Sequence, residues 1–121
     1  MSRNFHKMKI YSFGHKYLIP EIKENDLYVD VRDLKKFNTD IKNVGTDKVT
    51  RRKYLRNPDI RDFYEKNILF AVRENDFNSV YIGCHQGKHK SVCLAEQLFI
   101  DMKKRVYKYK NITLKHITID F

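Results

Sequence analysis

Residues 80–91 read VYIGCHQGKHKS, an apolar strand that runs into a polar, cationic turn and then into a helix. The strand would deliver Cys84 to the carboxyl edge of a sheet. The helix, beginning near Ser91, would point free N–H groups and the positive end of its dipole into the loop. The Ser91 hydroxyl would be its N-cap, or would instead turn toward a ligand. Gly87 would let the backbone approach an anion closely, and the two loop lysines add charge. The stretch therefore predicts a phosphate-binding loop.

The hydrophobic pattern on either side of this loop predicts an α/β fold. Apolar runs predict strands over 7–13, 27–31 and 79–83, and a closing strand or strand pair over 106–109 and 112–119. Helical spacing predicts helices over 48–56, 58–74 and 91–102, the first capped by Asp47 and the second opened by Pro58. We expect a single layered domain over 1–121, with a mostly parallel sheet and a strand–phosphate-loop–helix unit at residues 79–102.

Composition favours a polyanionic partner. The 121 residues are enough for one domain, and 25 Lys and Arg against 15 Asp and Glu give a formal net charge of +10. Such a balance suits nucleic acid or a phosphorylated small molecule. The alternative is that many of the lysines are simply solvated, so clustering has to decide.

The two cysteines, Cys84 and Cys93, are placed poorly for a disulfide and suit a reducing compartment. The chain shows no zinc-ligand spacing, no apolar stretch of signal-peptide length and no run long enough for a membrane span. We expect a cytoplasmic protein with neither a metal nor another cofactor and no membrane partner.

Ligands of parallel α/β sheets bind outside the carboxyl ends of the strands. This rule brings together the turns at 14–17 and 30–33 and the loop at 84–90. The loop lysines and Arg32 can hold a phosphate, while Asp30 can accept from hydroxyl or amino groups. The alternative for Asp30 is a structural ion pair with a neighbouring arginine.

Cys84 permits a catalytic hypothesis. With Lys90 six positions on and Ser91 next, the loop approximates the C-x-x-x-x-x-R-[S/T] loop of cysteine-dependent phosphatases. A Cys84 thiolate would attack phosphorus, and an Asp such as Asp30 or Asp33 would protonate the leaving group. However, lysine replaces the bidentate arginine, and a buried thiol at a strand end is common.

The same loop carries a family resemblance. Residues 82–92 (IGCHQGKHKSV), with AEQL at 95–98, resemble the C-terminal domain of the RNase adapter protein RapZ family. SFGHK at 12–16, VDVR at 29–32 and GTD at 45–47 resemble further motifs of that domain in the same order. The resemblance implies a domain similar to one that binds glucosamine-6-phosphate and small regulatory RNA, contacts an endoribonuclease and other regulators, and tends to dimerise.

The resemblance implies no established catalysis, so we expect a binding module rather than an enzyme; an enzyme would be a phosphoester hydrolase. We also expect a stand-alone version without the family's N-terminal P-loop ATPase domain, similar to versions encoded by bacteriophages. In that case the host cytoplasm would be its location, and a host regulatory protein or ribonuclease could be its partner.

Carried over by position, Asp30 matches the family's pocket aspartate, and the loop residues Cys84, Gly87, His89, Lys90 and Ser91 match its phosphosugar loop. The departures are Lys90 for arginine, Gln86 for a glycine, and Tyr17 and Asn38 for two pocket histidines. Phosphate binding should survive these changes better than amino-sugar recognition, and Tyr17 could stack on a base. The expected ligand site comprises Asp30, Arg32, Cys84, His85, Gln86, Gly87, Lys88, His89, Lys90 and Ser91, with His15, Tyr17 and Asn38 at its border.

Two basic segments are candidate RNA-binding surfaces. They contain Arg51, Arg52, Lys53 and Arg56, and Lys103, Lys104, Arg105, Lys108 and Lys110. Tyrosines interleaved with the second set could stack on bases, or could face a core while the lysines extend outward. The sequence thus predicts a regulatory, adaptor or ligand-sequestering module that binds a phosphosugar or nucleotide. An RNA-binding adaptor and a Cys84-dependent phosphatase or phosphodiesterase are the alternatives.

Overall fold

A computed structural model describes residues 6–34, 46–104 and 109–118. Its four strands form one sheet in the order β2-β3-β1-β4, and every pair of neighbours runs parallel. The strands are β1 (His6–Gly14), β2 (Asp26–Asp30), β3 (Ser79–Cys84) and β4 (Tyr109–His116). The predicted α/β fold with a mostly parallel sheet is therefore confirmed. Where a closing strand or pair was predicted, the described residues form one strand, and most of 106–109 lies outside them.

Helices α1 (Lys48–Leu55) and α2 (Pro58–Tyr64) begin where the sequence predicts, and α4 (Lys90–Lys103) begins one residue earlier. The π-helix η1 (Glu65–Leu69) and α3 (Phe70–Glu74) follow α2. The Asp47 carboxylate caps α1 by accepting from the Thr50 N–H at 2.9 Å, and the Asn57 side chain caps α2 ahead of Pro58. The helix predicted over 58–74 is not uniform, because five residues in its middle form a π-helix. A π-helix differs from an α-helix in the spacing of its backbone hydrogen bonds, which the spacing of apolar residues in the sequence does not reveal.

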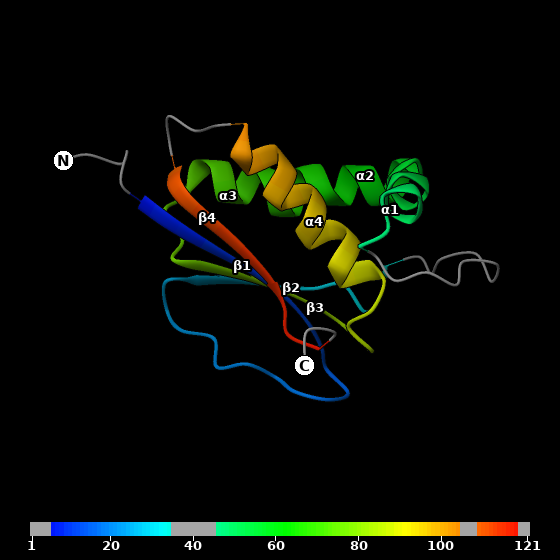
Figure 1. Ribbon diagram of the computed structural model, residues 1–121, viewed down its shortest axis with the longest axis horizontal. Helices are drawn as coiled ribbons and strands as arrows, with labels where there is room; N and C mark the ends of the chain where they lie inside the picture. The colour runs from blue at the N-terminus through cyan, green and yellow to red at the C-terminus, as the bar shows by residue number, and fades with distance from the viewer. Residues whose placement is uncertain (1–5, 35–45, 105–108, 119–121) are drawn as a thin grey trace.

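All described helices lie on one side of the sheet (Figure 1). Between the two layers is the main core, to which the strands contribute Met8, Ile10, Val29, Val80 and Ile82, and the helices Ile60, Ile68, Val72, Leu94 and Leu98. None of the described helices combines the length and apolar character needed to cross a bilayer.

The connection between β1 and β2, residues 15–25, takes the other side of the sheet. The β2-to-β3 and β3-to-β4 connections advance in one direction across the strand order, whereas β1-to-β2 goes back across β3. Because parallel crossovers are right-handed, the reversed one must lie on the opposite face. Figure 1 shows this segment running below the sheet, away from the helices.

Candidate functional site

The three strand-end loops named by the sequence are hydrogen-bonded together. At the end of β3, the Gly83 carbonyl accepts from the Val31 N–H at 2.9 Å. The Cys84 carbonyl accepts from the His15 N–H at 2.8 Å and from the His15 ring at 3.0 Å. The ends of β1, β2 and β3 therefore form one continuous edge, as the parallel topology requires.

Gly87 packs against β1 rather than standing open to a ligand. It has a φ of +73°, and a Cβ there would lie 2.5 Å from the Gly14 backbone nitrogen and 2.8 Å from Thr118 Oγ1. Thr118 Oγ1 also accepts from the Gly14 N–H at 2.8 Å. The glycine thus serves a tight backbone contact between two loops, in a region of φ that disfavours other residues.

Cys84 and Ser91 form a buried pair. Only 4% of Cys84 is exposed and Ser91 is fully buried, with 3.0 Å between Sγ and Oγ. The Gly87 N–H donates to Sγ at 3.1 Å. The prediction that Ser91 is the N-cap of the helix is wrong, because α4 begins one residue earlier behind His89 and has no side-chain cap.

This geometry has two consequences for chemistry. An N–H and a hydroxyl beside Sγ would stabilise a sulfur anion, as a nucleophilic cysteine needs. The burial of Sγ, however, keeps an incoming phosphorus atom out of bonding distance in this conformation. The catalytic role of Cys84 stays a prediction, and Cys93 is a second free, buried thiol whose pKa is raised to about 12 by burial.

Lys90 reaches across the edge to the loop after β2. Its Nζ donates to the Arg32 carbonyl at 2.6 Å and to the Leu34 carbonyl at 3.1 Å. The sequence analysis places Lys90 among the phosphate-binding residues of the loop, and that role stays a prediction. The structure also gives it a bracing role, because its ammonium donates to two main-chain oxygens of another loop.

The charged and polar side chains that remain on the loop surface are His85, Gln86 and Lys88, all exposed. His89 is partly buried, and burial, followed by the charge of Lys88, lowers its pKa. An anion bound beside it would oppose that shift. The accessible loop cation is therefore Lys88 rather than Lys90.

Asp30 and Arg32 form a bidentate ion pair at the end of β2. Arg32 Nη2 lies 2.7 Å from Asp30 Oδ2, and Arg32 Nε lies 3.0 Å from Oδ1. Hydrogen bonding from Arg32 lowers the pKa of Asp30 to about 2. The carboxylate is therefore ionised at neutral pH, which suits an acceptor better than an acid. Arg32 Nη1 has no hydrogen-bond partner among the described residues.

The β1 end of the site is aromatic. The His15 ring bridges the Cys84 carbonyl and the Tyr28 hydroxyl and lies against Phe13, with 4.8 Å between ring centroids. Tyr17 is 52% exposed, so its ring is accessible to a ligand. Asn38, the other position expected at the border, lies outside the described residues.

Two residues of this edge were missed by sequence reasoning. Thr118 follows β4 and contacts Gly14 and Gly87, and Tyr28 hydrogen-bonds His15 from within β2. The rule that ligands bind outside the carboxyl ends of parallel strands would have identified Thr118 if the last strand had been predicted to end at His116 rather than at 119. Nothing in the sequence distinguished Tyr28 from a core aromatic.

Behind the edge, a series of buried and partly buried polar groups joins the sheet to the helices. Ser12 Oγ lies 2.6 Å from His116 Nδ1, and His116 Nε2 lies 2.7 Å from Glu96 Oε2. Glu96 Oε1 is 4.0 Å from Arg51 Nη1. Arg51 is only 8% exposed and is therefore part of this series of polar groups. Its predicted place on an RNA-binding surface is wrong, because a buried guanidinium is not accessible to RNA.

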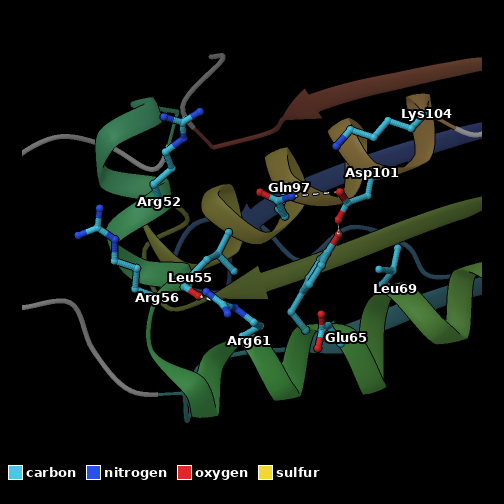
Figure 2. Close-up of a pocket in the computed structure, with 10 residues that line it drawn as sticks. Arg52, Leu55, Arg56, Arg61, Glu65, Leu69, Gln97, Asp101 and Lys104 are labelled. Carbon is cyan, nitrogen blue, oxygen red and sulfur yellow. Dashed lines mark hydrogen bonds between the residues drawn. The ribbon is translucent and has the colours of Figure 1, made fainter.

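The other predicted RNA-binding cations are exposed where the structure describes them. Arg52, Arg56 and Lys104 line a groove of about 760 Å³ between α1, α2, η1 and α4, with Lys104 at the end opposite Arg52 and Arg56 (Figure 2). Arg61 is a fourth cation there, and Leu55, Leu69 and Tyr64 supply apolar walls. Asp101 in the same groove accepts from the Tyr64 hydroxyl at 2.6 Å and from Gln97 at 3.1 Å.

The remaining members of the predicted RNA set contribute less to this groove. Lys53 is exposed on α1, and Lys103 lies over the Phe99 ring, 5.2 Å from its centroid. Arg105, Lys108 and the side chain of Lys110 lie outside the described residues. Residues of two basic segments that are far apart in sequence thus line one groove, and the members that do so are Arg52, Arg56 and Lys104.

Taken together, the fold and the edge define a class: α/β domains that present a cationic strand-to-helix loop at the carboxyl edge of a parallel sheet. A family model of the RapZ C-terminal domain matches residues 6–120. The chain belongs to the RapZ C-terminal domain family, which confirms the resemblance found in the sequence.

Curated relatives agree with this membership. The chain is 32% identical over 112 residues to a "Nucleotide-binding protein" of Pediococcus pentosaceus, covering 84% of this chain and 37% of the relative. A protein of the same name from Pseudothermotoga lettingae is 34% identical over 113 residues, with 84% and 40% covered. The chain thus spans well under half the length of these relatives.

Proposed function

We propose that this domain binds a phosphorylated small molecule, a nucleotide or phosphosugar, at the loop Cys84–Ser91, and acts as a regulatory, adaptor or ligand-sequestering module. The observation that carries the proposal is the uncapped N-terminus of α4 at an edge where three loops are hydrogen-bonded together and Lys88 is exposed. The name of the relatives, nucleotide-binding protein, supports the ligand class.

In this proposal different side chains contact the phosphate, the polar groups and the ring of the ligand. Lys88 and the free Nη1 side of Arg32 contact the phosphate, together with the first N–H groups of α4. Asp30 is ionised, so it accepts from a hydroxyl or amino group of the sugar or base. Tyr17 and His15 offer ring surfaces at the β1 end, which favours a ligand with a ring beyond its phosphate.

Lys88→Ala should weaken binding of the phosphorylated ligand about tenfold or more, because a charge-assisted hydrogen bond contributes about 1.5–3 kcal/mol. The fold should be unchanged, since Lys88 is exposed. Calorimetry against a panel of nucleotides and phosphosugars tests this, with Lys48→Ala on α1 as the matched control. Equal affinities of the two variants for a panel ligand would contradict the proposal. Lys90→Ala is less informative because Lys90 also braces the loop after β2.

Analysis of the ligand after incubation with the protein distinguishes a binding module from an enzyme. A binding module returns the ligand unchanged, whereas a Cys84-dependent hydrolase releases inorganic phosphate or a cleaved diester and loses this activity in Cys84→Ser. The buried Sγ favours the binding module, since only a loop rearrangement would bring phosphorus next to sulfur.

RNA binding is the second candidate function, favoured by the groove that joins Arg52 and Arg56 to Lys104. The double variant Arg52→Gln, Arg56→Gln should bind single-stranded RNA more weakly and should reduce the salt slope by about 1.4, because each phosphate contact on a single strand contributes about 0.7. Filter binding at several salt concentrations measures both quantities. Lys66→Gln with Lys7→Gln removes two exposed charges elsewhere and is the control; an equal loss there would mean that only net charge matters.

A further inference from the structure

A hydrogen-bonded histidine–tyrosine pair lies on the sheet face opposite the helices, at the carboxyl edge of the strands. The Tyr28 hydroxyl is bonded to His15 Nε2. Ile10 and Val29 belong to the core under the helices, so alternation along β1 and β2 turns Phe13 and Tyr28 to the opposite face. The Phe13 ring is fully buried there, with its centroid 4.8 Å from that of His15 and 6.1 Å from that of Tyr28. The pair is therefore held on a packed aromatic base.

A missing side chain at Gly83 makes room for the His15 ring. Gly83 of β3 pairs with Phe13 on one side and with Asp30 on the other. A Cβ at Gly83 would lie 2.4 Å from Phe13 Cζ and 2.6 Å from His15 Cε1, closer than carbon atoms approach without bonding. The ring thus lies over Gly83, and His15 acts electrostatically on Asp30. This packing fixes the ring beside the proposed ligand site.

The directions of the hydrogen bonds follow from the groups that His15 contacts. His15 Nδ1 lies 3.0 Å from the Cys84 carbonyl oxygen. A carbonyl can only accept, so Nδ1 carries the proton, and Nε2 of the neutral ring carries a lone pair. The Tyr28 hydroxyl therefore donates its proton to Nε2. Because that proton is used within the protein, the Tyr28 oxygen can act toward a ligand only as an acceptor.

Asp30 is a second acceptor on the same face. It follows Tyr28 by two residues along β2, and it acts electrostatically on Tyr28. Its carboxylate accepts from the backbone N–H, the Nε–H and the Nη2–H of Arg32, whereas a carboxylate has about four lone-pair positions. The Asp30 side chain is 37% exposed and Tyr28 is 40% exposed. Two accessible acceptors thus lie next to a guanidinium that is suited to a phosphate.

We propose that Tyr28 is a specificity-determining residue of this site: with Asp30 it selects a phosphorylated ligand that carries two neighbouring N–H or O–H donors beyond its phosphate. His15 is a positioning residue, because it keeps the Tyr28 oxygen an acceptor. A ligand that placed an acceptor there would set lone pair against lone pair and would be rejected. The inference rests on the proposed ligand site. The N1–H and 2-amino groups of guanine and the adjacent hydroxyls of a sugar are two sources of such donors.

Two matched pairs of ligands test the inference. Guanosine 5′-monophosphate and inosine 5′-monophosphate differ only in the 2-amino group, and glucose 6-phosphate and 2-deoxyglucose 6-phosphate differ only in one hydroxyl. Calorimetry at about pH 8, where an ordinary imidazole is neutral, should show a preference of about tenfold or more for the donor-bearing member of one pair. The pair that shows this preference identifies base or sugar as the source of the donors.

Tyr28→Phe should lower this preference to about threefold or less, because only the acceptor oxygen is removed and the ring stays. Affinity for the member that lacks the donor should change by less than about twofold, since the phosphate contacts are untouched. Tyr81→Phe is the matched control and should keep the full preference. Tyr81 pairs with Tyr28 across the sheet, but its hydroxyl interacts with Ser79 and Asp26 at the beginnings of the strands.

His15→Phe tests the positioning role. This variant keeps an aromatic ring over Gly83 but removes Nε2, so the Tyr28 proton becomes available to a ligand. The preference for the donor-bearing member should therefore fall although Tyr28 is present, while circular dichroism shows an unchanged fold. A preference that His15→Phe leaves intact would overturn the positioning role.

The remaining outcomes distinguish this inference from the proposed function. Equal affinity for both members of each pair, with binding itself retained, would overturn the inference and leave the proposed function standing. A preference that Tyr28→Phe leaves unchanged, or that Tyr81→Phe lowers equally, would also overturn the inference alone. A protein that binds none of the four ligands would overturn both the inference and the proposed ligand class.

Discussion

Replacing Glu96 with alanine should lower the free energy of unfolding by about 3 kcal/mol, because it removes the carboxylate that faces the buried guanidinium of Arg51 and the buried ring of His116. Glu96 holds His116 at 2.7 Å and lies 4.0 Å from Arg51, both of which are nearly buried. Removing Glu96 would leave the Arg51 guanidinium without this carboxylate, and Arg51 Nε already has no hydrogen-bond partner in the described part of the chain. Urea unfolding monitored by circular dichroism gives the value.

The control for this experiment is Glu74→Ala, which removes an exposed carboxylate at the end of α3 and should change stability by less than about 0.5 kcal/mol. Glu96→Gln separates charge from hydrogen bonding, since the amide oxygen can still accept from His116 but brings no charge to Arg51. Equal stability of the Glu96 and Glu74 alanine variants would show that the Ser12–His116–Glu96–Arg51 chain does not hold the sheet to α1 and α4.

The network also affects how RNA binding is tested. Neutralising Arg51 would destabilise the protein, so lost RNA binding in such a variant would report unfolding rather than a lost contact. Only the exposed Arg52 and Arg56 are suitable positions on α1.

Gly87→Val should destabilise the protein and abolish ligand binding together. Backbone strain at a φ of +73° costs about 1–3 kcal/mol for a β-branched residue, and the new Cβ would also press on the Gly14 backbone and on Thr118. The loop would have to move away from β1, which would displace the N-terminus of α4. Thermal unfolding and ligand calorimetry measure the two effects.

His85→Val is the matched control for Gly87→Val, because it adds the same side chain to an exposed position of the same loop without a positive φ. We expect it to retain most of the stability. If Gly87→Val were as stable as His85→Val and still bound ligand, the close contact between the β1 and β3 loops would not be needed for the site.

Much of the fold could be predicted because its signals are local. The caps at Asp47 and Asn57–Pro58 are set by the hydrogen-bonding capacity of single residues, and the strands by short apolar runs. The loop at 84–90 and its neighbours at the ends of β1 and β2 follow from one rule about parallel sheets. Ser91 was misread because a serine near a helix start caps in many proteins, and burial against Cys84 is invisible in sequence.

The sequence by itself determined the α/β class, the family and the loops that share an edge, since periodicity and turn chemistry act over a few residues. Only the tertiary structure decided what the side chains do there. Lys90 braces a distant loop, Arg51 turns inward to Glu96, and Gly87 serves a backbone contact with Gly14. Each of these depends on partners far away in the chain, and their proximity is created by the order and handedness of the strand connections, which no local pattern encodes.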